Sequence, residues 1–156
     1  MPTNLLRNMR APPVRSTGRQ NQLPADAERV AVLTIGDRRI RLTLASSLTA
    51  DLIWRALPLY ATAETWGDSL HFEIPVHAGR DRTAVINGQL GLVYFWTEEQ
   101  RILLPFGPTP ISRAGQCRLP SPANVWAASL DDVGRLAGIE PGEKVGLLAA
   151  ANLPTA

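Results

Sequence analysis

The sequence has one cysteine, two histidines and one lysine in 156 residues, and these scarcities exclude several kinds of protein. A single cysteine, Cys117, cannot form an intrachain disulfide, and without a cysteine cluster there is no thiolate set for a structural zinc site. No apolar run approaches the roughly 20 residues that a membrane-spanning helix needs. We therefore expect a reducing, cytoplasmic setting and no membrane partner.

The positive charge is confined to the start of the chain, although the formal net charge is +2. Residues 1–24 hold four arginines and no acid, which leaves 12 basic and 14 acidic residues in the remainder. Such a body lacks the basic stripe that follows a phosphate backbone, so we expect no nucleic-acid partner. The same segment has prolines, polar residues and no apolar period. It predicts a disordered extension over 1–24, one domain over 25–152 and a short tail over 153–156.

Short apolar runs between turn residues predict a mainly β fold. The eight predicted strands are Val30–Ile35, Ile40–Leu44, Tyr60–Trp66, Ser69–Val76, Leu90–Trp96, Arg101–Phe106, Ala123–Ala128 and Lys144–Ala150. Gly36-Asp37 and Gly67-Asp68 tolerate positive φ and predict hairpin turns between neighbouring strands. Eight strands suit a closed barrel, because closure removes exposed sheet edges.

Two short helices complete the prediction. The first covers Thr49–Leu57, with Thr49 as its cap and Pro58 as its end. The second begins with Ser129-x-x-Asp132, which resembles a capping box, and ends at Gly138. We interpret 77–86 as a polar loop, and 107–122 as irregular because prolines and glycines recur through it.

Four segments in a fixed order resemble one known family. They read TWGDSLHFEIPV at Thr65–Val76, GLVYFW at Gly91–Trp96 followed by LPFGPTPIS at Leu104–Ser112, SPANV at Ser121–Val125, and GEKV at Gly142–Val145. Together they are similar to the small prokaryotic cyclophilin-like domain family, a branch of the cyclophilin superfamily without an established activity. The resemblance runs from about Val30 to Ala150. It implies a closed eight-stranded cyclophilin-like β-barrel with two helices, and it supplies no catalytic residue.

Peptidyl-prolyl isomerisation is the enzyme alternative that this resemblance brings. The uncatalysed barrier is about 18–20 kcal/mol, and lowering it takes an apolar slot for the proline ring and a donor aimed at the prolyl nitrogen. True cyclophilins carry that donor, an arginine, within a strand, whereas the comparable strand Ser69–Val76 has none. Arg80, Arg82 and Arg113 lie in predicted loops, where solvated side chains are the simpler interpretation. A non-catalytic assembly partner is a further alternative.

A metal site is the second chemical alternative. His71, Glu73 and His77 share the polar face of their predicted strand, and imidazole with carboxylate suits zinc, iron or manganese. Cupin metal sites, however, use three histidines and a glutamate, and this chain has only two histidines. We therefore interpret these residues as the polar face of a half-buried strand and expect no cofactor.

A pocket on the flank of the barrel is the function that we favour, because ligand sites are commonly apolar with a few polar groups. Bulky aromatic residues, Trp96 among them, lie on adjacent predicted hairpins. The loop Gly107-x-Thr109-Pro110 is held rigid by its prolines and can present backbone donors. The predicted ligand-binding residues are Trp66, Phe95, Phe106, Thr109 and Asn124. We expect a small molecule or short peptide as ligand and a monomer or homodimer.

Overall fold

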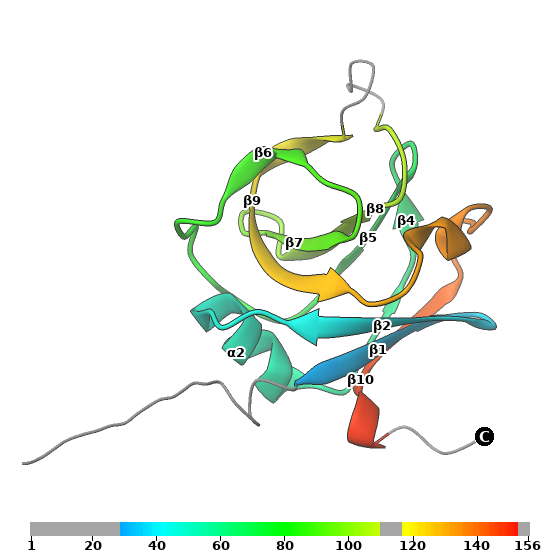
Figure 1. Cartoon of the computed structure of the whole chain (residues 1–156), viewed down its shortest axis with the longest axis horizontal. Helices are drawn as coiled ribbons and strands as arrows, with labels where there is room; N and C mark the ends of the chain where they lie inside the picture. Colours follow the sequence, from blue (N-terminus) through cyan, green and yellow to red (C-terminus); the bar gives the residue numbers. More distant parts are fainter. Residues whose placement is uncertain (1–28, 110–116, 153–156) are drawn as a thin grey trace, which may run out of the picture.

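The computed structural model of the chain describes residues 29–109 and 117–152, which form one nearly closed, barrel-shaped sheet and one α-helix (Figure 1). The strands are β1 (Val30–Ile35), β2 (Arg38–Leu44), β3 (Leu59–Thr62), β4 (Glu64–Thr65), β5 (Ser69–Glu73), β6 (Val85–Gly88), β7 (Leu92–Trp96), β8 (Arg101–Pro105), β9 (Cys117–Ser129) and β10 (Lys144–Ala149). The helix α2 covers Leu48–Ala56, and short 3₁₀ turns cover Val133–Leu136 and Ala150–Asn152. The predicted mainly β class is confirmed, with ten strands where eight were expected. The predicted extension over 1–24 and tail over 153–156 lie outside the described residues.

The sheet comes close to closing because its two ends belong to one stretch of chain. The strand order is β3-β10-β1-β2-β9-β7-β8-β5-β4, with β6 paired to β9. Only Ala63 separates β3 from β4, and its N–H donates to the carbonyl of Glu143 over 2.8 Å. The prediction of one strand over Tyr60–Trp66 was wrong, since the first half pairs with β10 and the second half with β5.

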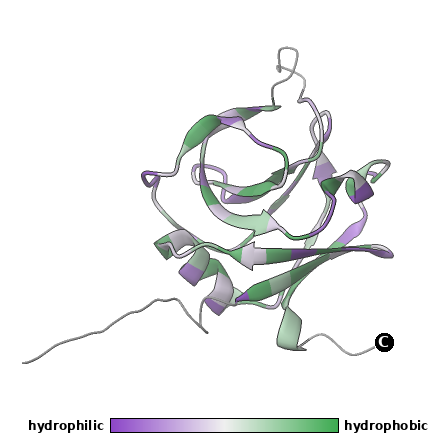
Figure 2. Cartoon of the chain, viewed as in Figure 1, coloured by the Kyte–Doolittle hydropathy of each residue, from purple (hydrophilic) through white to green (hydrophobic). Residues whose placement is uncertain are grey.

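The inward face of the barrel is filled by apolar side chains that we call the main core. Its largest members are Leu33, Ile35, Ile40, Leu42, Ile53, Leu70, Phe72, Ile74, Phe95, Ile102 and Trp126, all nearly inaccessible to solvent. Hydrophobic and hydrophilic residues alternate along β2, as expected for a strand with one buried face (Figure 2). The helix α2 adds Ala50 and Ile53 to this core, and its cap is Ser47, not the predicted Thr49.

The long strand β9 corrects the largest error of the sequence analysis. Its first half, residues 117–122, was predicted to be irregular because of its prolines, and β6 lies partly in a segment predicted to be a loop. Pro120 and Pro122 are tolerated because the β6–β9 register is interrupted between Val85 and Asn87, opposite these prolines. Figure 1 shows β9 curling with β6 over the outward side of the sheet.

This curl encloses a smaller apolar cluster, which we call the second core. It consists of Tyr94, Leu103, Leu119 and Ala123, all buried. Strands β7 and β8 therefore have apolar residues on both faces, one face toward the main core and the other toward the second core.

The second predicted helix is only a 3₁₀ turn, Val133–Leu136. Ser129 does not cap it, because Ser129 is still part of β9 and its hydroxyl bonds to Asp131. Asp132 is the cap, and its carboxylate accepts from the Gly134 N–H over 2.9 Å. The predicted end at Gly138 is confirmed by a φ of +87°, which glycine tolerates. None of the helices in the described residues has the length and apolar character needed to span a membrane.

Candidate functional site

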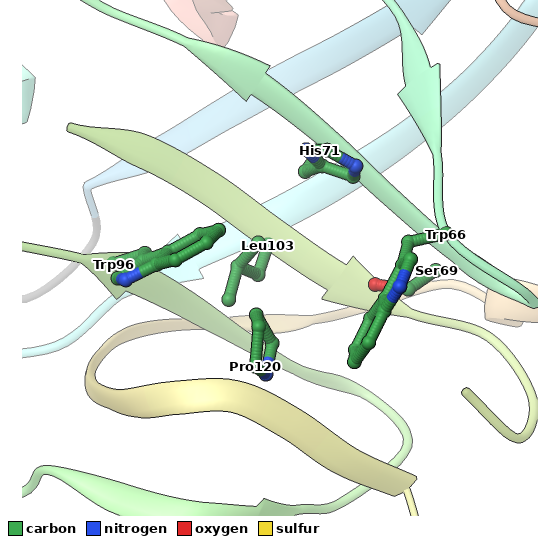
Figure 3. A pocket seen from close by; sticks show the side chains of 6 residues that line it. All are labelled: Trp66, Ser69, His71, Trp96, Leu103 and Pro120. Carbon is green, nitrogen blue, oxygen red and sulfur yellow. The ribbon is translucent and has the colours of Figure 1, made fainter. Parts of the chain in front are cut away.

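A small apolar pocket of about 250 Å³ lies on the outward face of the sheet, beside the second core (Figure 3). It is lined by Trp66, Ser69, His71, Trp96, Leu103 and Pro120. The volume lies just below the ~300–1,000 Å³ that is usual for drug-sized ligands. The pocket therefore suits a ligand of one ring system or one side chain.

Strand register explains why these residues meet. β8 lies between β5 and β7, and Leu103 pairs with His71 on one side and with Tyr94 on the other. Because side chains alternate along a strand, Ser69 and His71 share the outward face of β5, while Leu70 between them enters the main core. Leu103 thus forms the floor of the pocket, and β5 supplies two polar groups at its wall.

Two tryptophans stand on opposite sides of this floor (Figure 3). Trp66 follows β4, and its backbone N–H donates to the Ser69 carbonyl over 3.0 Å. Gly67, with φ of +60°, turns the chain directly after it. Trp96 ends β7, and both indoles are half-buried. Neither indole N–H has a hydrogen-bond partner among the residues that the structure describes, so each pairs a broad apolar face with an unused donor.

The ion pair between Arg101 and Glu64 lies behind the pocket and determines which nitrogen of the His71 imidazole carries the proton. One guanidinium nitrogen of Arg101 lies 2.6 Å from the Glu64 carboxylate and 3.4 Å from His71 Nδ1. Since a guanidinium only donates, Nδ1 accepts and the ring proton belongs on Nε2. Burial, reinforced by repulsion from Arg101, lowers the pKa of His71 below its ordinary value, although Glu64 opposes the shift. The imidazole is therefore neutral near pH 7.

Ser69 is the most buried polar group of the lining. Its residue is 2% exposed, and its hydroxyl has no hydrogen-bond partner within 29–109 and 117–152. Buried hydroxyls are nearly always hydrogen-bonded in native proteins, so an unused one beside a pocket is unusual. Figure 3 shows its oxygen on the pocket side, next to the Trp66 indole.

Of the five predicted ligand-binding residues, the structure places one, Trp66, in the pocket. Phe95 is fully buried in the main core, and Phe106 packs against that core from the end of β8. Thr109 is buried, with its hydroxyl donating to the carbonyl of Arg118. Asn124 is buried between α2 and the loop after β5, where its side chain bonds to that loop and to Thr49. It is not among the residues that line the pocket.

Some of the pocket residues that were not predicted could have been found from the sequence. Alternation along β5 already places Ser69 and His71 on one face, and Trp96 was among the noted aromatics. Leu103 lies in an unbroken apolar run, which hides its orientation. Pro120 depends on the curl of β9, which no local pattern predicts.

The three residues considered for a metal site do not meet at one place, because His71 lines a different hollow from Glu73 and His77. Among the described residues, no three histidine, cysteine or acidic side chains gather in an arrangement that could hold a metal ion. His71 turns toward the pocket, whereas Nδ1 of His77 lies 2.8 Å from the Gln100 side chain at a separate, shallow hollow that Glu73 also lines.

Of the three arginines considered for isomerisation, the two that the structure describes, Arg80 and Arg82, are not among the residues that line the pocket. Arg80 is exposed and lies 2.6 Å from the Glu98 carboxylate, and Arg82 is exposed as well. Arg113 lies outside the described residues. Arg101 contacts a lining residue, with a guanidinium nitrogen 3.4 Å from His71 Nδ1, but it is not itself among the residues that line the pocket.

Comparisons with known proteins agree with the fold. A family model described as Cyclophilin-like matches residues 29–147. The solution structure of the hypothetical protein AF2241 from Archaeoglobus fulgidus is similar, with 27% identity, a TM-score of 0.68 and coverage of 80% of this chain and 96% of that one. McbB in complex with tryptophan shares the fold at 16% identity and a TM-score of 0.56, over 81% of this chain and 46% of McbB. No curated protein matches the sequence.

Proposed function

The chain belongs to the cyclophilin-like family, and we propose that its barrel is a binding domain whose outward pocket holds one ring of a small molecule. A fold does not specify a function, and a similar solved structure, AF2241, is itself a hypothetical protein. The proposal therefore depends on the chemistry of the pocket and not on its relatives.

The pair of indoles on opposite sides of Leu103 is the observation that carries the proposal. A planar ring seated over Leu103 would contact both indoles, and each such aromatic contact contributes about 0.5–1.5 kcal/mol beyond simple burial. Pro120 adds a further apolar wall. These surfaces favour a small ring compound, and a proline or aromatic side chain of a short peptide offers a similar shape.

We propose binding without a reaction because the polar groups of the pocket are not arranged for catalysis. Ser69 and His71 are next neighbours on one face of β5, but within the described residues no hydrogen bond joins the hydroxyl to the imidazole. A serine nucleophile needs a base within about 3.2 Å to take its proton. The hydroxyl is therefore suited to binding a ligand and not to attacking it.

A screen of ring compounds by ligand-observed NMR tests the proposal. The set contains indole, quinoline, proline-containing dipeptides and tryptophan, the compound bound in the McbB structure. We expect hits that Trp66→Leu and Trp96→Leu each weaken about tenfold, which corresponds to one lost aromatic contact of ~1.4 kcal/mol.

Trp54→Leu is the matched control, since Trp54 is a half-buried tryptophan of α2 outside the pocket lining. It should leave the affinity of each hit unchanged, and circular dichroism should confirm that all three variants are folded. Hits that survive both pocket substitutions, or no hit at all, would contradict the proposal. Preference for the dipeptides would identify a peptide ligand.

A further inference from the structure

The buried hydroxyl of Ser69 restricts the chemistry of the ligand that fits the pocket. This group is 2% exposed, lines the pocket and lacks a hydrogen-bond partner among residues 29–109 and 117–152. A buried hydroxyl without a partner is energetically unfavourable, so an occupant that bonds to it recovers free energy. The apolar walls cannot provide such a bond.

His71 adds a donor of fixed sense on the same face of β5. Because Arg101 donates toward Nδ1 over 3.4 Å, the ring proton belongs on Nε2, and the neutral imidazole acts as a donor through that atom. Glu64 holds Arg101 in place over 2.6 Å. Figure 3 shows the indole nitrogen of Trp96 at the end of its ring away from Leu103, so the polar groups available to a ligand are the Ser69 hydroxyl and the His71 imidazole.

Within residues 29–109 and 117–152, no aspartate, glutamate, lysine or arginine lines the pocket. The nearby Arg101 is already paired with Glu64 and therefore offers little to an anion. Moving a charged group into such an apolar pocket without an ion partner is costly. A neutral ligand avoids this cost.

We infer that the ligand is an uncharged planar ring compound whose edge carries a hydrogen-bond acceptor, a ring nitrogen or a carbonyl, directed at Ser69 and His71. This inference rests on the proposed function, since it names the class of ligand for the same pocket. The ring lies between the indoles, and its acceptor accepts a hydrogen bond from the Ser69 hydroxyl or from the His71 Nε2–H. A carbonyl ligand with an adjacent N–H would also donate to the Ser69 oxygen.

Three bicyclic probes of similar size separate the contributions: naphthalene has no polar atom, quinoline has one acceptor, and 2-naphthoate is an anion. Their affinities are measured near neutral pH by NMR titration of the full chain and of two variants, Ser69→Ala and His71→Phe. We expect Ser69→Ala, His71→Phe or both to weaken quinoline about 3- to 10-fold, the loss of one hydrogen bond. Naphthalene should change by less than about twofold, because it makes no such bond.

Ser46→Ala and His77→Phe are the matched controls, since both residues are exposed and outside the pocket. They should leave every affinity unchanged. Equal effects of the two pocket variants on naphthalene and quinoline, or tightest binding of 2-naphthoate, would overturn the inference while leaving the binding function intact. Failure of all three probes to bind the unmodified chain would overturn both.

Discussion

The two faces of β5, β8 and β7 use the same strands for different purposes. Toward the main core they present close-packed apolar side chains such as Phe72 and Phe95, which are almost inaccessible to solvent. Toward the outside they present Ser69, His71 and Trp96 around a pocket. Strand alternation separates the two sets residue by residue, so one face can carry stability while the other is free to bind.

Aromatic residues in one hairpin therefore need not serve one purpose. Phe95 and Trp96 are neighbours in the chain, yet Phe95 belongs to the main core and Trp96 to the wall of the pocket. Substitutions of the inner set should therefore lower the free energy of unfolding, and substitutions of the outer set should lower ligand affinity.

Phe95→Ala should have the largest effect on stability. Removing a fully buried phenylalanine from a packed core lowers the free energy of unfolding by about 3–5 kcal/mol. Urea denaturation followed by circular dichroism measures the loss. The milder Phe95→Leu should cost about 1 kcal/mol and leave probe affinity unchanged. A Phe95→Leu protein that is stable but has lost its affinity would show that the two faces are not independent.

Asn124→Ala should come second, because Asn124 ties the loop after β5 to the barrel. Its side chain accepts from the Asp81 N–H over 2.9 Å and donates to the Gly79 carbonyl over 2.9 Å and to the Thr49 hydroxyl over 3.1 Å. Leaving these buried partners unpaired should lower the free energy of unfolding by about 2–3 kcal/mol. Denaturation measures the loss, and amide exchange at Asp81 should accelerate.

The exposed Asn87 of β6 provides the matched control for this substitution. Asn87→Ala should change the free energy of unfolding by less than about 0.5 kcal/mol. If Asn124→Ala is equally mild and instead weakens ring probes, the assignment of Asn124 to a structural role is wrong and the ligand-binding prediction regains support.

Asp131→Asn should have a smaller, pH-dependent effect at the outer surface of β2. Hydrogen bonds from the Arg41 side chain and backbone, at 2.9–3.1 Å, lower the pKa of Asp131 from 3.8 to about 2. The carboxylate therefore contributes fully above pH 3.8, and its contribution is lost as the pH falls toward 2. The substitution should cost about 1 kcal/mol at neutral pH.

Urea midpoints of the unmodified chain and of Asp131→Asn, compared across this pH range, measure the effect. The difference between the two proteins should shrink as the pH falls. Arg135→Gln should change the free energy of unfolding less than Asp131→Asn does, since Arg135 lies 3.9 Å from the Asp131 carboxylate. A difference that persists unchanged at low pH would show that the carboxylate charge is not the cause.

Much of the fold follows from local patterns. The alternation in Ser69–Val76 places Leu70, Phe72, Ile74 and Val76 on one face of the strand, opposite its polar face, and all four are buried. Gly36 and Gly67 adopt the positive φ that their predicted turns require. The first half of β9 was missed because proline usually breaks a strand, and only the three-dimensional register shows that Pro120 and Pro122 face an interruption in β6.

The pocket was less predictable, and the second core is the reason. Residues of β7 and β8 are apolar on both faces because each face meets a core, so the sequence shows no alternation there. Without alternation, Phe95 cannot be distinguished from Trp96 as the residue that points outward. The meeting of Trp66 with Pro120 depends on the curl of β9, a long-range feature that single-strand patterns do not encode.

The smallest predicted effect concerns the protonation of His71, and it tests whether the outward face is as dry as the pocket suggests. Burial, and then the charge of Arg101, lower its pKa below the ordinary 6.5, while Glu64 opposes them. The unfolded chain should therefore take up a proton near pH 6.5 while the folded chain does not. As the pH falls below that value, the unfolded state binds more protons and the stability contribution of His71 decreases. Above it, His71 contributes no pH dependence.

Proton NMR of the imidazole signals measures this directly, because the chain has only two histidines and His77→Gln assigns the remaining one. The His71 signal should titrate below pH 6.5 in the folded protein. His71→Phe should also reduce the decrease in the free energy of unfolding between neutral pH and pH 5. The reduction should be less than about 1 kcal/mol, since one pKa unit corresponds to ~1.4 kcal/mol. Binding a ring probe should lower the pKa of His71 further, because the ligand excludes water from the imidazole. A His71 signal that titrates at or above pH 6.5 would mean that water reaches the imidazole freely. The pocket would then be an open part of the surface and not a dry site on the outward face of the sheet.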